Sequence, residues 1–207
     1  MKTDRAVLFL TDIFGVQFVN NRLLADNFAR AGYFVAAPDL FKADPVGINQ
    51  LSDPTFSFAD WNSKHPQVVI DGIIDSIISA LQSQFGSKKI AAAGYCFGGK
   101  FVTRHLAPGN GLDVGFTAHP SNVLDAEYQA VANPLSIAFG DLDTANPPAA
   151  RASAESILRA SNIAFQTSLY SNAEHGFAVR TNLSDPQKKF AQESAYYQAV
   201  RFFDTWM

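Results

Sequence analysis

The sequence predicts an α/β fold in which a mostly parallel sheet is covered by helices on both faces. Short, continuous apolar runs alternate with longer segments of helical periodicity along the whole chain. Continuous apolar runs are typical of strands that are buried on both faces, and their alternation with helices is typical of parallel sheets. The length of 207 residues fits a single domain over residues 1–207.

Six short apolar runs predict the strands of this sheet. Each run is bounded by glycine, proline or polar residues, which are turn signals. In chain order, the expected strands are Ala6–Thr11, Tyr33–Ala37, Lys89–Ala93, Val114–Ala118, Leu135–Phe139 and Phe165–Leu169.

The helices between these strands are justified by apolar spacing or by end signals. Leu23, Leu24 and Phe28 share one face of the first helix, and apolar residues recur at helical spacing for about five turns of the second. Glycine follows both of these helices, and proline marks the start of the last two. The expected helices are Arg22–Ala31, Gln67–Phe85, Phe97–Leu106, Pro148–Ala160 and Asp185–Trp206.

The longest irregular segment is 38–66, which is rich in Asp, Pro and Phe and has weak periodicity. A loop of this length in a compact domain is typically a lid or the wall of a pocket. A surface excursion that contains one short helix is the other interpretation, and the sequence leaves both open.

Composition excludes several classes of function. The net charge of −3, with scattered Lys and Arg, does not favour nucleic-acid binding. The chain has no run of 18 apolar residues, so no membrane association is expected. A single cysteine excludes an internal disulfide and a multi-cysteine metal site. We therefore expect a cytoplasmic protein without metal or cofactor, as a monomer or weak homodimer.

The stretch AAAGYCFGGKF, residues 91–101, carries two competing motifs. Gly94 to Lys100 match the G-x-x-x-x-G-K pattern of a phosphate-binding P-loop. That loop requires Ser or Thr after the lysine, because the hydroxyl binds magnesium, and Phe101 stands there instead. The P-loop interpretation is therefore disfavoured, and Lys100 is expected to be an ordinary residue in the first turn of a helix.

Gly94 to Gly98 also match a nucleophile elbow with cysteine in place of serine. An elbow is a sharp turn from strand to helix, so small residues must stand two positions from the nucleophile on each side. Cys96 would then lie at a helix N-terminus, where the helix dipole favours a thiolate. A buried structural cysteine is the alternative interpretation of a lone Cys.

A cysteine nucleophile needs a base, and the chain offers four histidines. His65 precedes a proline at a helix start, His105 lies inside the helix after the elbow, and His119 follows a strand. Only His175 comes last in order and on a loop beyond a late strand, which is where α/β hydrolases carry their histidine.

The acid of such a site is expected after the strand Leu135–Phe139, in the segment AFGDLDTANPP. Asp141 and Asp143 both lie there. Asp143 is farther along the loop, from which it can reach His175, and is favoured. Asp141 is the alternative and is expected to cap the turn instead.

Six stretches of the sequence resemble the dienelactone hydrolase family, a cysteine-dependent branch of the α/β hydrolases. The elbow followed by the histidine loop is the most specific part of the resemblance, and its His-Gly-Phe form is more similar to fungal and eukaryotic members. The stretches are TDIFG (11–15), LADNFARAGYFVAAPDLF (24–41), GYCFGGK (94–100), AHP (118–120), FGDLD (139–143) and EHGFAVR (174–180).

The resemblance implies an α/β-hydrolase fold, here lacking the usual N-terminal strand pair. It also implies that Cys96 attacks an ester, lactone or thioester carbonyl to form an acyl-enzyme, with His175 managing protons and Asp143 holding the imidazole. The backbone N–H groups of Ile13 and Phe97 would form the oxyanion hole. The expected partner is a small, dienelactone-like ester or lactone substrate.

Two further residues are candidates for resting-state or substrate contacts in such a site. The resemblance implies that Asp12 interacts with the cysteine in the resting enzyme, and a turn aspartate is its alternative role. The bacterial members hold the substrate's carboxylate with arginines, and Arg180, five residues after His175, is a candidate for this contact; a surface ion pair is its alternative role. The segment DPTFSFADW, residues 53–61, favours a more apolar pocket wall than a dienelactone requires. A non-catalytic binder of a small apolar ligand or partner is the alternative function.

Overall fold

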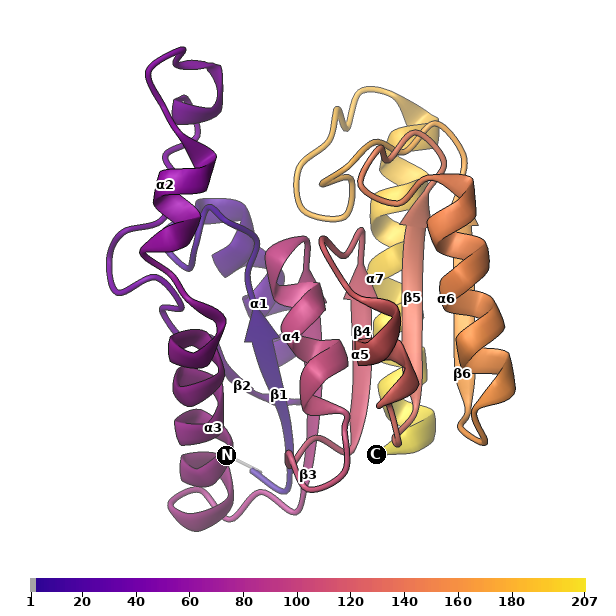
Figure 1. The fold of residues 1–207 in the computed structure, drawn as a ribbon. Coiled ribbons are helices and arrows are strands. Elements are labelled where there is room, and N and C mark those ends of the chain that lie inside the picture. Colours follow the sequence, from indigo (N-terminus) through magenta and orange to yellow (C-terminus); the bar gives the residue numbers. More distant parts are fainter. Residues whose placement is uncertain (1–2) are drawn as a thin grey trace.

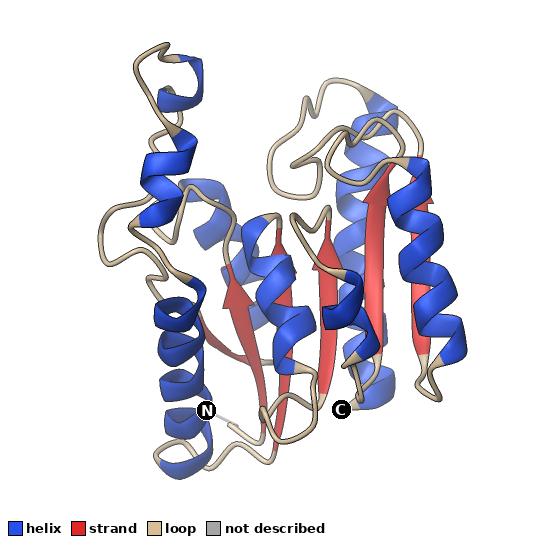
Figure 2. Ribbon diagram, in the orientation of Figure 1, coloured by secondary structure: helices blue, strands red, loops and turns tan. Residues whose placement is uncertain are grey.

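A computed structural model describes residues 3–207 of the chain. Its centre is a six-stranded sheet in the order β2-β1-β3-β4-β5-β6, in which every pair of neighbouring strands is parallel (Figures 1 and 2). The strands are β1 (Arg5–Leu10), β2 (Phe34–Ala36), β3 (Lys89–Tyr95), β4 (Val114–Ala118), β5 (Leu135–Gly140) and β6 (Phe165–Tyr170). The predicted α/β class and the six predicted strands are confirmed.

Helices cover both faces of this sheet, as Figure 1 shows. On one face, α3 (Gln67–Ser83), α4 (Phe97–His105), α5 (Asp125–Gln129) and α6 (Pro148–Ala160) pack on the strands. On the other face lie α1 (Val19–Arg30) and α7 (Pro186–Trp206). None of the helices in the described part of the chain is long and apolar enough to cross a membrane.

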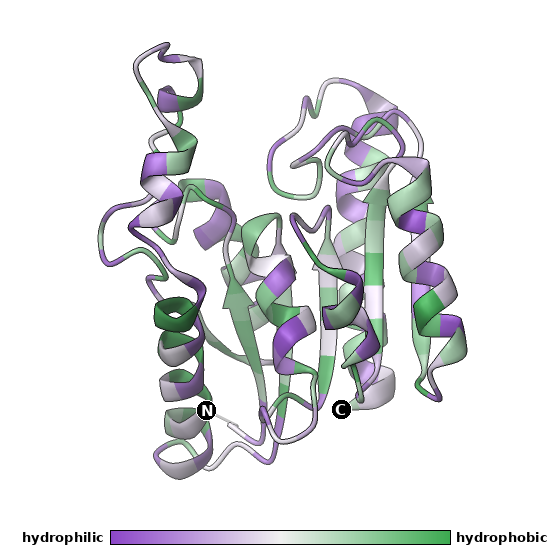
Figure 3. Cartoon of the chain, viewed as in Figure 1, coloured by the Kyte–Doolittle hydropathy of each residue, from purple (hydrophilic) through white to green (hydrophobic). Residues whose placement is uncertain are grey.

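The alternation of side chains along β1 explains why an uninterrupted apolar run forms a strand here. Ala6, Leu8 and Leu10 face the core under α3 and α4, whereas Val7 and Phe9 face the core under α1 and α7. All five are fully buried, so both faces of the strand are apolar. Figure 3 shows the same pattern, with hydrophobic colours along the strands and mixed colours on the helices.

The short helix α5 was not predicted, and among the predicted helices the first has the largest error at its start. α1 begins at Val19, three residues before the predicted start at Arg22. Its first turn contains Asn20 and Asn21, which hid it from a search for apolar periodicity. Asn21 is buried and donates hydrogen bonds to Asp12 and to the carbonyl of Gly15, so polar contacts rather than apolar packing fix this turn.

Segment 38–66 contains a short 3-10 helix, η1 (Gln50–Ser52), and the helix α2 (Phe58–Ser63). Figure 1 shows that its outer part extends well beyond the carboxyl end of the sheet. Its inner part is anchored, because Phe41 and Trp61 are buried and their rings lie 5.1 Å apart. Both rings also contact Phe97, with centroids at 5.2 and 6.1 Å. The segment therefore reaches the residue that follows Cys96.

Candidate active site

Cys96 occupies the turn between β3 and α4 in a backbone conformation that L-residues rarely adopt. Its φ is 52° and its ψ is −110°, and its side chain is buried. Such strain persists only where surrounding contacts enforce it, and it is characteristic of functional sites. The predicted elbow is present, because the strand ends at Tyr95 and the helix begins at Phe97.

Gly98 explains how the helix comes so close to the sheet. A Cβ at position 98 would overlap the carbonyl group of Leu10 in β1. The backbone N–H of Gly98 donates to the carbonyl of Thr11 at 3.1 Å. A Cβ at Gly94 would lie 2.6 Å from the carbonyl oxygen of Gly98. The two glycines therefore let α4 press on β1 and β3, which fixes the direction in which Cys96 points.

His175, on the loop between β6 and α7, lies between Cys96 and Asp143. Its Nε2 is 3.0 Å from the Cys96 Sγ, and its Nδ1 is 2.9 Å from Asp143 Oδ1. The three residues are 47 and 32 positions apart in sequence, and all lie on loops at the carboxyl ends of parallel strands. The structure thus brings together the three residues that the sequence order selected.

The carboxylate of Asp143 is enclosed by donors. In addition to His175, the backbone N–H of Ala145 donates to Oδ1 at 2.9 Å and the amide of Asn146 donates to Oδ2 at 2.9 Å. Burial alone would raise the pKa of Asp143, but these hydrogen bonds and the charge of His175 lower it. Asp141, the alternative acid, is exposed and accepts from the backbone N–H of Ala173 at 3.3 Å.

Opposing effects act on His175. Burial favours the neutral imidazole, whereas the hydrogen bonds and charges of Asp143 and Cys96 favour the imidazolium. The second effect is larger and raises the pKa of His175 to about 10. A protonated Nε2 donates to Sγ, so this geometry suits a thiolate–imidazolium pair.

His119 lies directly against His175, with ring centroids 5.1 Å apart and the rings nearly perpendicular. It is fully buried, and neither ring nitrogen has a hydrogen-bond partner within residues 3–207. Burial, and then the positive charges of His175 and Arg180, hold the pKa of His119 well below its ordinary value. His119 is therefore a neutral neighbour of the site.

Asp12 and Arg180 form an ion pair beside this arrangement. Arg180 Nη1 donates to Asp12 Oδ2 at 2.8 Å, and the guanidinium lies over the ring of Phe14 at 4.7 Å. The Asp12 side chain is fully buried, whereas the Arg180 side chain is 26% exposed. Burial raises the pKa of Asp12. The hydrogen bond from Asn21 and the charge of Arg180 lower this pKa, but the effect of burial is larger.

Two backbone N–H groups at the carboxyl end of the sheet have no acceptor among residues 3–207. Phe97 begins α4, so its N–H has no intrahelical acceptor, and Ile13 lies on the loop after β1. Neither N–H donates to an acceptor in the part of the chain that the structure describes. These are the two groups that the sequence analysis assigned to an oxyanion hole.

The remaining histidines lie elsewhere. His65 Nδ1 donates to the carbonyl of Trp61 at 2.8 Å, and its ring packs on the Trp61 ring. His105 contacts the carbonyl of Phe101 in the same way, inside α4, and lies 3.3 Å from Asp75. Neither ring is in contact with Cys96.

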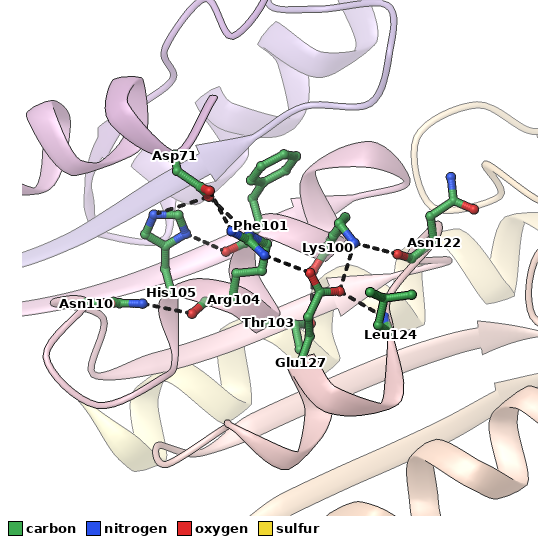
Figure 4. Close-up of polar contacts among 11 residues, drawn as sticks. Asp71, Lys100, Phe101, Thr103, Arg104, His105, Asn110, Asn122, Leu124 and Glu127 are labelled. Carbon is green, nitrogen blue, oxygen red and sulfur yellow. Dashed lines mark hydrogen bonds and ion pairs between the residues drawn. The ribbon is translucent and has the colours of Figure 1, made fainter. Parts of the chain in front are cut away.

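The expectation for Lys100 was wrong. Its side chain is buried, and Nζ donates to the carbonyl of Asn122 at 2.7 Å and to Glu127 at 2.8 Å (Figure 4). Glu127 also accepts from Arg104 at 2.9 Å. Lysine is rarely buried unless it is paired, so this is a structural role that an ordinary helix residue does not have.

Two more polar residues of the site were missed by the sequence analysis. Ser121 Oγ lies 3.4 Å from Cys96 Sγ and 3.5 Å from His175 Nε2. Asn146 binds Asp143, as described above, and also donates to the carbonyl of Pro120 at 2.7 Å. The sequence signals that could have identified them are an Asn three residues after the acid and a Ser directly after His-Pro at a strand end.

Two surface cavities lie away from these residues. One, of about 630 Å³, lies between α1 and α7, and the other, of about 620 Å³, lies between α1 and β2. Neither is lined by Cys96, Asp143 or His175.

Comparison with known proteins agrees with this architecture. The model of the dienelactone hydrolase family matches residues 2–207. Hydrolase pyvD of Aspergillus violaceofuscus is 40% identical over 99% of this chain and 82% of its own length. Dienlactone hydrolase 2 of Gibberella moniliformis is 32% identical over 97% of this chain and 78% of its own length.

Among solved structures, the esterase Pf2001 of Pyrococcus furiosus has a TM-score of 0.72 at 16% identity, covering 99% of this chain and 84% of that chain. The dienelactone hydrolase of Anabaena variabilis has a TM-score of 0.68 at 15% identity, covering 98% and 86%. These two structures share the fold with this chain, whereas the sequence matches establish the family. The chain is a hydrolase that belongs to the dienelactone hydrolase family.

Proposed function

We propose that this hydrolase cleaves a small ester or lactone through an acyl-enzyme on Cys96, with His175 as the proton carrier and Asp143 as its orienting acid. The contacts of His175 carry this proposal, because one ring nitrogen meets the sulfur at 3.0 Å and the other meets the carboxylate at 2.9 Å. A nucleophile, a base and an orienter within hydrogen-bond reach are the requirements of covalent acyl transfer.

In the first half of the reaction, the thiolate of Cys96 attacks the carbonyl carbon of the substrate. The electron pair of the C=O bond moves to oxygen, and the N–H groups of Ile13 and Phe97 receive that charge. As the C–O bond to the leaving group breaks, the imidazolium of His175 gives its proton to the departing oxygen. The product is a thioester on Cys96 and a free alcohol, or a tethered hydroxyl if the substrate is a lactone.

In the second half, water attacks the thioester, and neutral His175 takes the proton from that water. The carboxylic acid departs, and the thiolate–imidazolium pair is restored. Asp143 keeps Nδ1 protonated throughout, so that Nε2 is the nitrogen that exchanges the proton. The free N–H groups and the direction of the His175 bonds support this sequence of steps.

Asp12 and Arg180 enter the proposal as a pair. The partly exposed guanidinium of Arg180 suits a substrate carboxylate, and the buried Asp12 holds the guanidinium in place at 2.8 Å. A substrate anion would share Arg180 with Asp12. Replacing Arg180 should then raise KM for an acidic ester more than for a neutral ester of the same size.

The test is the replacement of Cys96 by Ala and by Ser. Cys96→Ala should abolish turnover of an activated aryl ester while circular dichroism and thermal unfolding stay close to wild type. Cys96→Ser should turn over the same ester much more slowly than wild type, because the site favours a thiolate. Mass spectrometry of rapidly quenched wild-type enzyme should show the acyl group on Cys96. Undiminished turnover by Cys96→Ala would exclude Cys96 as the nucleophile and refute this mechanism.

A further inference from the structure

The loop after β4, residues His119–Asn122, runs beside the contact between Cys96 and His175. Ser121 Oγ is 3.4 Å from Cys96 Sγ and 3.5 Å from His175 Nε2, while those two atoms are 3.0 Å apart. The three polar atoms therefore form a triangle. The hydroxyl of Ser121 is the only serine or threonine hydroxyl hydrogen-bonded to Cys96 among the described residues.

The geometry decides which bond of the Ser121 hydroxyl matters. A distance of 3.5 Å is at the outer limit for a bond between nitrogen and oxygen, whereas 3.4 Å is ordinary when sulfur accepts, because sulfur is larger. His175 Nε2 already supplies one donor to the thiolate. A rotatable hydroxyl has one proton to give, and a thiolate has capacity for a second donor.

The position of Ser121 is fixed by anchors on both sides. Its own N–H donates to the carbonyl of Cys96 at 3.0 Å, and the N–H of His119 donates to the carbonyl of Ala138 at 2.8 Å. The carbonyl of Pro120 accepts from Asn146, which also binds Asp143. The loop is thus tied to the nucleophile, to β5 and to the acid loop.

Lys100 supplies the last anchor. Its buried ammonium donates to the carbonyl of Asn122, one residue after Ser121, at 2.7 Å, and Figure 4 shows this bond beside the pair with Glu127. Asn122 has a φ of 55°, in the left-handed region where asparagine is enriched, and the bond from Lys100 fixes its carbonyl in that turn. Lys100 lies in the first turn of α4 and Cys96 is the N-cap of the same helix, so one element orients both the sulfur and the loop that faces it.

We propose that Ser121 is a further catalytic residue, whose hydroxyl donates a hydrogen bond to the Cys96 thiolate, and that Lys100 is the positioning residue that holds it there through the Asn122 carbonyl. This inference rests on the proposed function, since it needs Cys96 to react as a thiolate. The hydroxyl increases the fraction of enzyme that carries the thiolate on the acid side of the pH range.

Other groups around the sulfur also influence its charge and must stay unchanged in the test. They come from each loop packed against the site, namely Asp12 after β1, His119 after β4, Asp143 after β5, and His175 and Arg180 after β6. Substitutions at Ser121 and Lys100 leave all five side chains in place. A change in the pH profile then reports on the hydroxyl and its anchor.

The experiment is the rate of alkylation by iodoacetamide as a function of pH. Cys96 is the only cysteine, so the modified site is known in every variant. Ser121→Ala and Ser121→Gly should move the acid limb of the profile by about one pH unit to higher pH, which is about tenfold slower alkylation on that limb. The plateau rate at high pH should stay within about threefold of wild type. Ser76→Ala, on the exposed face of α3, should leave the whole profile unchanged.

Lys100→Met should shift the acid limb in the same direction as Ser121→Ala, and combining the two should add little to the shift of Ser121→Ala alone. The matched control is Arg104→Met, which removes another partner of Glu127 but does not touch Asn122. Its profile should overlay the wild type. An equal shift for Arg104→Met would show that Lys100 acts through general stability and would overturn its positioning role.

Different outcomes would refute the cysteine mechanism and the role of Ser121. If wild-type enzyme reacts as slowly near pH 6 as a free thiol, whose pKa is about 8.5, the cysteine mechanism itself is wrong. If wild-type enzyme reacts rapidly near pH 6 and the Ala and Gly variants overlay its profile, Cys96 keeps its role and the role of Ser121 is refuted. Because two variants lack the hydroxyl, a folding defect in one leaves the other to decide.

Discussion

Asn146 donates its side-chain amide to Asp143 Oδ2 at 2.9 Å, on the carboxylate oxygen that His175 does not use, and the same amide nitrogen donates to the carbonyl of Pro120 at 2.7 Å. One amide therefore connects the acid loop with the loop that carries Ser121. Asn146 is buried, so these bonds have little competition from water.

Asn146→Ala should lower the free energy of unfolding by about 1–3 kcal/mol, because it leaves a buried carboxylate oxygen and a buried carbonyl without a donor. It should also lower kcat more than it raises KM, since the orientation of His175 depends on Asp143. Urea unfolding and steady-state kinetics measure the two effects. Asn110→Ala, which removes an exposed amide, is the control and should change neither quantity appreciably.

The ion pair of Asp12 and Arg180 predicts that removing the arginine lowers the free energy of unfolding by an amount that depends on pH. Without Arg180, the buried carboxyl of Asp12 should have an even higher folded pKa, so that folding takes up a proton. Stability is then lost as pH rises from about 4, the unfolded value, toward that raised pKa. Arg180→Met should therefore be less destabilising near pH 5 than near pH 8, where the cost reaches about 3 kcal/mol.

Urea unfolding of wild type and Arg180→Met across this range measures that cost. Arg159→Met, an exposed arginine on α6, should show no such trend. In Asp12→Asn/Arg180→Met, which has no buried carboxyl at this position, the pH dependence should disappear. A cost for Arg180→Met that is constant with pH would contradict the assignment.

The raised pKa of His175 predicts the alkaline limb of catalysis. With a pKa of about 10, His175 stays protonated at neutral pH and loses its proton only as pH rises through about 10. An alkyl ester needs that proton for its leaving group, so its kcat/KM should be level from about pH 7 to 9 and fall above that. An activated aryl ester, whose leaving group needs no proton, should show no such fall. Stopped-flow acylation rates with both esters test the difference.

Gly98 predicts a large local effect of one methyl group. Its Cβ would overlap the backbone of Leu10, which cannot move without disturbing β1. Gly98→Ala should therefore cost at least about 3 kcal/mol or prevent folding. Gly72→Ala on α3 is the matched control, because nothing lies within 4 Å of its Cβ position, and it should stabilise the helix by about 0.5–1 kcal/mol. Thermal unfolding of both variants compares them.

The sheet and the Cys96–His175–Asp143 arrangement were accessible from the sequence for physical reasons. Strands buried on both faces must be continuous apolar runs, as in β1 and β3. An elbow needs small residues at fixed spacing, and Gly94 and Gly98 provide them. Chain order then selected His175 and favoured Asp143 over Asp141.

The roles of Lys100, Ser121 and Asn146 were not accessible in the same way. Each depends on a backbone atom as partner, namely the carbonyl of Asn122, the carbonyl of Cys96 or the carbonyl of Pro120. The positions of those carbonyl groups depend on how two loops meet after folding, so a local sequence pattern cannot predict them. The Asp12–Arg180 contact joins positions 168 residues apart and has the same origin.

Segment 38–66 has a different relation to the molecule from the loops that carry Cys96, Asp143 and His175. It meets the site through Phe41 and Trp61, which rest on the ring of Phe97, while its outer part stands clear of the sheet (Figure 1). The inner part of this segment is therefore coupled to the helix that follows the nucleophile, whereas Cys96, Asp143 and His175 take their hydrogen bonds from other loops. We expect sequence changes in the outer part of the segment to leave the contacts of these three residues intact.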